Sequence, residues 1–140
     1  MSFLNSLNVA GSALTAQRFR MDIITQNLAN LDTTAMSEDE AYRRKMVVFQ
    51  EQKLSFDDVL NNTKNGGVKA VQVVESDAEL RKVYDPESPL AGEDGYIIYS
   101  NVDSAEEQID LMAASNSYEA NITALSIVKA MAMRALDIGK

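Results

Sequence analysis

Two long stretches, one at each end of the chain, repeat apolar residues every seven positions. Toward the end, the repeat has two series: Leu111, Tyr118, Leu125 and Ala132, and Ala114, Asn121, Val128 and Ala135. At the start, the corresponding series are Leu7, Leu14, Met21 and Leu28, and Ala10, Gln17, Ile24 and Leu31. Apolar residues at this spacing are typical of the a and d positions of a coiled coil. The repeats therefore predict one long helix over residues 2–31 and a second over residues 103–140.

The C-terminal helix has more apolar residues than one seam requires. Outside the two series lie Ile122, Ile127, Met131, Met133, Leu136 and Ile138. A helix that is apolar nearly all round is normally covered by several neighbours. Two arrangements remain open: an antiparallel two-helix core within a monomer, and an assembly of several chains. The surplus of apolar residues favours the assembly.

The expected ends of the helices suggest how they pair. Ser104 and Glu107 have the spacing of a capping box, which predicts a helix that begins there. A chain that leaves the first helix near Leu31 and enters the second near Ser104 predicts antiparallel packing. Matching the two seams layer by layer then places Leu14 opposite Val128.

Between the helices the apolar pattern changes to that of strands. Strands are predicted over Lys45–Gln52, Gly67–Val74 and Tyr96–Tyr99, with a turn over Asn61–Gly67 before the second. The stretch 84–89 contains two prolines and predicts an extended connector. The fold class is thus mainly α, an antiparallel coiled coil of terminal helices around a small β-hairpin and extended middle. We divide the chain into residues 1–34, 35–102 and 103–140.

Composition excludes several kinds of function. The chain has no cysteine and no histidine, which removes thiol nucleophiles, imidazole bases and the commonest zinc ligands. Residues 37–110 hold 17 acidic and 8 basic side chains, a net charge of −9 against −8 for the whole chain. An acidic middle argues against nucleic-acid binding. The basic run Arg43-Arg44-Lys45 follows Glu38, Asp39 and Glu40, which predicts local ion pairs and leaves a docking role open. We expect no catalytic site, metal, cofactor or small-molecule substrate.

Targeting signals are weak in this sequence. No apolar run reaches the length of a membrane span, and residues 1–21 lack the basic start, apolar core and cleavage site of a secretory signal. The same residues contain serine and no acidic group, which keeps a transit peptide as an alternative.

Five segments resemble a known family. Residues 27–34 (NLANLDTT) and 115–121 (SNSYEAN) are similar to the N- and C-terminal signatures of bacterial flagellar rod, hook and hook-associated proteins. Residues 42–49 (YRRKMVVF), 83–89 (VYDPESP) and 95–102 (GYIIYSNV) resemble, in the same order, the proximal-rod family of the FlgC type. Ser100 stands where that family usually has proline, and residues 38–41 replace a stretch rich in glycine and proline. These departures leave the path of residues 35–42 open, where Ser37 and Glu40 have the spacing to cap a short helix.

The resemblance implies a structural subunit that polymerises through its terminal helices into a helical drive shaft, which transmits motor torque to the hook. Implied partners are copies of itself, other rod proteins, the type III export apparatus and the motor's membrane ring. The implied location is the periplasmic rod of the basal body, reached without a cleaved signal peptide. The residues expected at subunit interfaces are Leu7, Leu14, Met21, Ile24, Leu28, Asn30, Leu111, Tyr118, Asn121, Ile122, Leu125 and Val128. Asn30 and Asn121 are candidates for fixing helix register, although Asn30 equally suits a helix end.

Two other classes compete with this interpretation. An enzyme would need a cleft with convergent acid and base groups, and only carboxylates, lysines and tyrosines are available. A soluble coiled-coil adaptor or export chaperone would share the helices but would not need the ordered middle segments.

Overall fold

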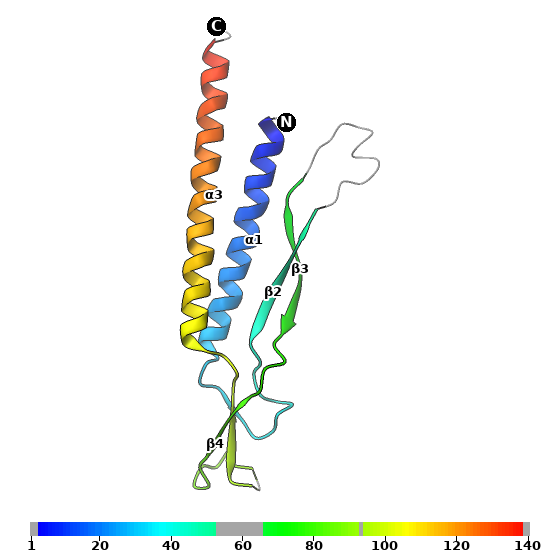
Figure 1. Cartoon of the computed structure of the whole chain (residues 1–140), viewed down its shortest axis with the longest axis vertical. Coiled ribbons are helices and arrows are strands. Elements are labelled where there is room, and N and C mark those ends of the chain that lie inside the picture. The colour runs from blue at the N-terminus through cyan, green and yellow to red at the C-terminus, as the bar shows by residue number, and fades with distance from the viewer. Residues whose placement is uncertain (1–2, 53–65, 93, 139–140) are drawn as a thin grey trace.

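The computed structural model describes residues 3–52, 66–92 and 94–138, and shows an elongated molecule with two long helices side by side (Figure 1). Helix α1 spans Phe3–Ala29 and helix α3 spans Ser104–Ile138. The helices run antiparallel, and α3 continues beyond the N-terminal end of α1 (Figure 1). The two predicted terminal helices are confirmed.

The described residues between the helices form five strands. They are β1 Thr34–Ala35, β2 Lys45–Glu51, β3 Val68–Glu75, β4 Arg81–Tyr84 and β5 Tyr96–Tyr99. Strands β2 and β3 form an antiparallel pair, and β1, β5 and β4 form a second antiparallel sheet in that order. The three predicted strands are confirmed as β2, β3 and β5. The turn expected at Asn61–Gly67 lies mostly outside the described residues.

The extended connector predicted around Pro86 and Pro89 is wrong. Tyr84 ends β4 and pairs with Tyr96 of β5, so the prolines lie in the loop of a β-hairpin. Backbone bonds from Asp85 N–H to the Gly95 carbonyl and from Ala91 N–H to the Ser88 carbonyl close this loop. The prolines need no ladder hydrogen bond in a loop, which reconciles them with a neighbouring strand.

Residues 36–41 form bends and turns, so the short helix suggested by Ser37 and Glu40 is not formed. Glu38 instead forms an ion pair with Lys82 of β4 at 2.6 Å. This ion pair joins the loop to the three-stranded sheet. The path of residues 35–42, which the sequence left open, therefore follows the sheet. An ion pair with a residue distant in sequence forms there in place of the local helix cap.

The β2–β3 pair lies along α1 (Figure 1). Ser12 of α1 connects them, because its hydroxyl accepts a hydrogen bond from Val68 N–H at 3.1 Å and donates one to the Val9 carbonyl at 2.8 Å. Gly67 permits this close approach, since a Cβ at that position would overlap the Ser12 hydroxyl. The absence of a side chain at one strand end thus sets how closely the hairpin packs on α1.

Asp103 caps the start of α3, so the predicted capping box at Ser104 and Glu107 is wrong. The Asp103 carboxylate accepts hydrogen bonds from Ala105 N–H at 2.7 Å and Glu106 N–H at 3.2 Å. These bonds satisfy two of the free N–H groups at the helix N-terminus. The Glu107 carboxylate is completely buried and bonds to other segments, which is why it does not reach back to the cap.

The register predicted from the seams is also wrong. That register places Asn27 level with Ser115, but the Asn27 side chain donates a hydrogen bond to the Glu107 carboxylate at 3.1 Å. The difference of eight residues corresponds to about 12 Å along a helix. A second contact is displaced in the same direction, because Arg20, which the predicted register places level with Ile122, pairs with Asp110 at 2.9 Å. The helices are therefore displaced by at least about one heptad, and a displacement of one heptad brings Leu14 level with Asn121.

Candidate assembly interface

The residues predicted for the interface differ in how far their own subunit covers them. Ile24 is buried within the subunit. Half-buried positions are Leu7, Leu14, Met21, Leu28, Asn30, Leu111, Tyr118, Asn121, Leu125 and Val128. Ile122 is exposed. The helices that carry the two predicted seams thus pair within one subunit, and part of most seam side chains stays open to solvent.

The two asparagines proposed to fix register bond to their own helices. The Asn30 amide donates to the Gln26 carbonyl at 2.7 Å, and the Asn121 amide donates to the Ser117 carbonyl at 2.8 Å. Asn30 follows directly after α1, and its carbonyl accepts hydrogen bonds from the backbone and side chain of Thr33. These contacts fit the alternative in which Asn30 ends the helix.

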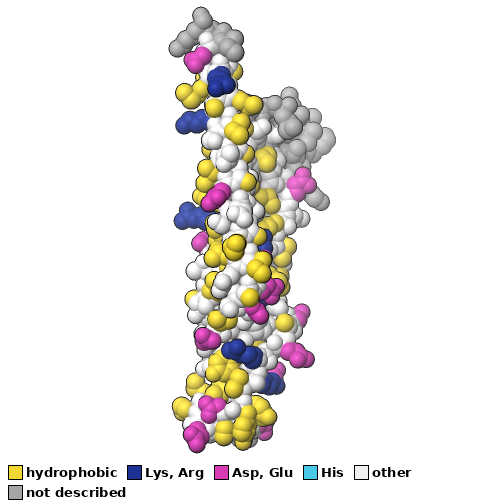
Figure 2. Space-filling view, turned by 60° about the vertical axis from the view of Figure 1, so that its left-hand side comes forward, with side chains coloured by type: hydrophobic (Ala, Val, Ile, Leu, Met, Phe, Trp, Pro, Cys, Tyr) yellow, Lys and Arg dark blue, Asp and Glu magenta, His cyan; other side chains and the backbone are white. Residues whose placement is uncertain are grey.

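Several large apolar side chains of α3 are not covered by their own subunit. We call them together the outer α3 surface and define it by seven exposed residues: Ile109, Met112, Ile122, Ile127, Met131, Met133 and Leu136. Leu136 is 73% exposed and Ile109 is 67% exposed, so neither is covered by its own subunit. Figure 2 shows apolar side chains spread along one side of the molecule between a few charged ones. Exposed large apolar side chains in this number on one helix favour an interaction site.

The β2–β3 pair also has apolar residues on both faces. Met46, Val48, Val71 and Val73 are exposed, whereas Val47 and Phe49 of β2 are partly covered. A run of four consecutive apolar residues in β2 is typical of a strand that is covered on both sides. The hairpin therefore adds to the uncovered apolar surface of the subunit.

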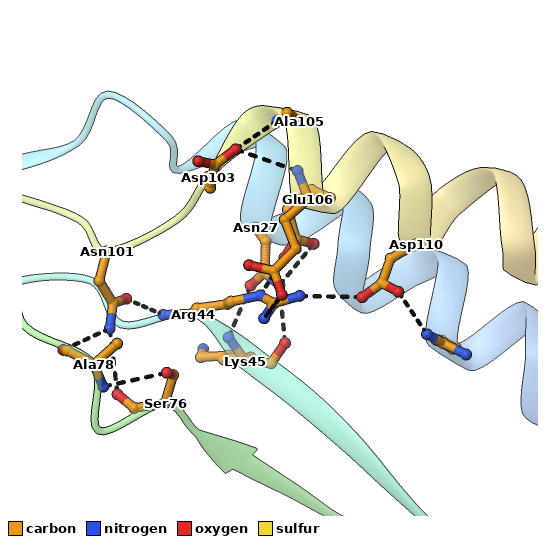
Figure 3. A network of polar contacts seen from close by, with 12 residues as sticks. Asn27, Arg44, Lys45, Ser76, Ala78, Asn101, Asp103, Ala105, Glu106 and Asp110 are labelled. Atoms are coloured by element: carbon orange, nitrogen blue, oxygen red, sulfur yellow. Dashed lines mark hydrogen bonds and ion pairs between the residues drawn. The ribbon is translucent and has the colours of Figure 1, made fainter.

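Three sequence segments meet in a group of polar side chains where the helices approach the sheets (Figure 3). We call this group the polar clamp and define it as Asn27, Tyr42, Arg44, Asn101 and Glu107. Asn27 of α1 is 1% exposed. Its amide donates to the Lys45 carbonyl at 2.8 Å, and its side-chain oxygen accepts from Lys45 N–H at 3.0 Å and from the Tyr42 hydroxyl at 2.9 Å. Asn27 thus pairs with a backbone segment as a neighbouring strand would.

Arg44 connects the clamp to α3. Its guanidinium donates to Glu107 at 2.5 Å, to Glu106 at 2.7 Å and to Asp110 at 3.0 Å. The backbone N–H of Arg44 donates to the Asn101 side chain at 2.7 Å. A buried carboxylate such as Glu107 is tolerated only with a paired charge and further hydrogen bonds, and Arg44 and Asn27 supply both.

Burial and charge shift two pKa values in the clamp. Burial, followed by the negative charges of Glu107 and Glu75, raises the pKa of the Tyr42 hydroxyl. Burial acts to lower the pKa of Arg44, but its bonds to Glu107 and Glu106 outweigh this and raise it. Both groups keep the protonated forms that donate the observed hydrogen bonds.

The local ion pairs predicted for Arg43-Arg44-Lys45 are wrong for Arg44, whose acidic partners lie about sixty residues away on α3. The clamp was not predicted as a site from the sequence. One signal was present, because continuing the series of Ala114, Asn121 and Val128 backwards by seven reaches Glu107. A carboxylate at a seam position needs a buried partner. A basic side chain from another segment is the kind of partner that this signal indicates.

The residues that the structure describes offer little for catalysis or metal binding. No group of three or more acidic, histidine or cysteine side chains within them could hold a metal ion. Across the same described ranges, neither helix combines the length and apolar character that a membrane crossing needs.

Comparison with known proteins agrees with the arrangement of signatures at the two ends. Residues 7–35 match the family described as flagella basal body rod protein, and residues 93–138 match the C-terminal family of the flagellar basal body rod FlgEFG proteins. The chain is 45% identical to the flagellar basal-body rod protein FlgC of Bacillus subtilis strain 168 and 41% identical to that of Salmonella typhimurium. It is 36% identical to FlgC of Yersinia enterocolitica. All three alignments cover both chains completely.

Proposed function

The chain belongs to the family of flagellar basal-body rod proteins of the FlgC type, and on that basis we propose that it polymerises through its terminal helices into the proximal rod. Membership makes it a structural subunit of the basal-body rod and not an enzyme, and its partners are other rod components. The proposal concerns how it assembles. In it, residues 1–34 and 103–140 supply the tube contacts, and residues 35–102 form a β-containing part at one end.

The outer α3 surface is the observation that carries this proposal. Seven large apolar side chains on one helix are exposed in the isolated subunit. Burying a side chain of this size is worth about 1.5–3 kcal/mol, so a neighbouring subunit that covers several of them gains substantial stability. A contact between different surfaces of identical subunits gives a filament when its rotation does not close into a ring.

We propose that the seam residues hold α1 and α3 together as a coiled coil within each subunit. Their half-buried side chains then complete contacts with the helices of adjacent subunits, which unites the predicted seam residues and the outer α3 surface in one interface. The exposed apolar face of the β2–β3 pair is covered in the same assembly. The rod so formed transmits torque from the motor to the hook.

The same proposal places the rod in the periplasm, in contact with the motor's membrane ring. Subunits pass through the type III export apparatus without a cleaved signal peptide. The soluble adaptor or export chaperone is not favoured, because such a role does not require a surface that becomes covered only in a polymer.

Electron microscopy of basal bodies purified from cells that express a tagged copy tests this proposal. We expect the tag to label the rod between the membrane ring and the distal rod, at several copies in each basal body. A label on the export apparatus alone, or a copy found only in the soluble fraction, would support the adaptor and contradict the rod.

A further inference from the structure

The apolar seams of α1 and α3 permit more than one register. Residues repeat every seven positions on both helices, so a slide of one heptad, about 10 Å, again places a and d positions opposite one another. The observed register brings Leu14 near Asn121, and a slide in one direction brings it near Val128. A slide in the other direction would bring Asn27 level with Ser100, before α3 begins at Ser104. The apolar pattern therefore leaves two registers to choose between.

The polar clamp is compatible with only one of them. In the alternative register, Glu107 would lie about 10 Å from Asn27, beyond the end of α1 at Ala29. A hydrogen bond now 3.1 Å long cannot persist over that distance. Arg20 and Asp110, paired at 2.9 Å, would separate as well.

The backbone between the helices opposes the slide too. Arg44 N–H bonds to Asn101, three residues before α3, and Lys45 N–H bonds to Asn27 on α1. Two adjacent N–H groups thus bond to α1 and to the segment just before α3. Moving α3 by a heptad would require one of these bonds to break or residues 101–103 to rearrange.

We infer that Asn27, Arg44 and Glu107 determine the register of α1 against α3, which the apolar seam leaves undecided. Buried polar groups are best attested in this role in coiled coils, where they select one alignment. The residues act by positioning the helices. They need not contact a neighbouring subunit to do so.

The register also decides how much of α3 projects beyond α1 (Figure 1). The exposed side chains of Met133 and Leu136 lie on this projecting part. A slide of one heptad would change its length by about 10 Å. This consequence for assembly rests on the proposed function, whereas the register itself does not.

Pairs of introduced cysteines measure the register, since the native chain has none. Leu14→Cys with Asn121→Cys reports the observed register, and Leu14→Cys with Val128→Cys reports the alternative. A disulfide requires Cα atoms within about 7 Å. The yield of each intrachain crosslink is measured on the purified full chain, so the result does not depend on rod assembly.

We expect the parent chain to form the 14–121 crosslink and little of the 14–128 crosslink. The test variant replaces three members of the clamp together: Asn27→Leu, Arg44→Leu and Glu107→Leu. It removes the polar side chains that favour the observed register without leaving a buried unpaired charge. We expect the ratio of 14–128 to 14–121 crosslinks to rise about tenfold or more. The matched control is Glu106→Leu, which removes the neighbouring and largely exposed carboxylate partner of Arg44 and should leave the ratio unchanged.

Several outcomes would overturn the inference. A triple variant with parental helix content by circular dichroism and a parental crosslink ratio shows that Asn27, Arg44 and Glu107 do not determine the register. A parent chain without the 14–121 crosslink shows that this register is not held. If the triple variant loses its helix content, Glu107→Gln keeps the size and one acceptor, and its ratio should still rise about threefold; an unchanged ratio there contradicts the role of Glu107.

Discussion

Asn27 joins α1 to the start of β2, two parts of the chain that local sequence patterns do not relate to each other. Its amide bonds in both directions to the backbone of Lys45, while Tyr42 donates to the same side-chain oxygen. The sequence identified residue 27 as part of a signature but gave no physical reason for an amide there. That reason is the backbone of a segment 18 residues away, which helical periodicity cannot reveal.

Tyr42 offers a test of the clamp at the level of one hydroxyl. Tyr42→Phe removes the hydrogen bond to Asn27 and should lower the free energy of unfolding at pH 7 by about 1 kcal/mol. Burial raises the folded-state pKa of Tyr42 above its ordinary value of 10.0. The phenol therefore ionises first in the unfolded chain, and its stabilisation is complete below pH 10 and is lost as pH rises through the folded pKa.

Urea unfolding at pH 7 and at several values above pH 10 measures both effects. The parent should lose stability with rising pH more steeply than Tyr42→Phe. Tyr84→Phe is the control, because Tyr84 is exposed and keeps its edge contact with the Tyr96 ring at 5.2 Å. Equal slopes for the parent and Tyr42→Phe would show that the Tyr42 hydroxyl is not desolvated.

At the level of elements, apolar patterns predicted those parts of the fold that bury apolar side chains. Seven-residue repeats located α1 and α3, and apolar runs located β2, β3 and β5. Strand β4 is exposed along its whole length and was missed, because no burial pattern marks it. It forms through its ladder with β5 and follows from tertiary pairing, which local sequence does not encode.

Gly67 tests the contact between the β2–β3 pair and α1. Gly67→Ala places a Cβ against the Ser12 hydroxyl and forces the strand end away from the helix. We expect a loss of about 1–3 kcal/mol in the free energy of unfolding. The matched control is Gly11→Ala within α1, where a Cβ meets no other atom and the helix gains about 1 kcal/mol. Thermal unfolding measures the stability of both variants. A stabilised Gly67→Ala would contradict the close approach of Gly67 to Ser12.

At the scale of the whole molecule, the sequence predicted which helices pair but not how they align. Because heptads repeat, several registers match apolar layers equally well, and the register predicted from the sequence was the wrong one. The alignment follows from Arg44 and Glu107, which lie in different predicted segments and meet only in the folded chain. The surplus apolar residues of α3 favoured an assembly of several chains, and seven large apolar side chains of this helix are exposed in the subunit.

The uncovered end of α3 provides the most direct test of assembly. Leu136→Asp changes a side chain that is 73% exposed in the subunit, so the isolated chain should change in stability by about 0.5 kcal/mol or less. In the proposed rod the same position is covered by a neighbour, and an unpaired buried charge there costs several kcal/mol. Every subunit repeats that cost, so we expect normal folding by circular dichroism and loss of swimming in soft agar.

Asp94→Ser alters an exposed carboxylate of the β-containing part and should leave swimming intact. Normal swimming with Leu136→Asp would place the assembly contacts elsewhere on the subunit.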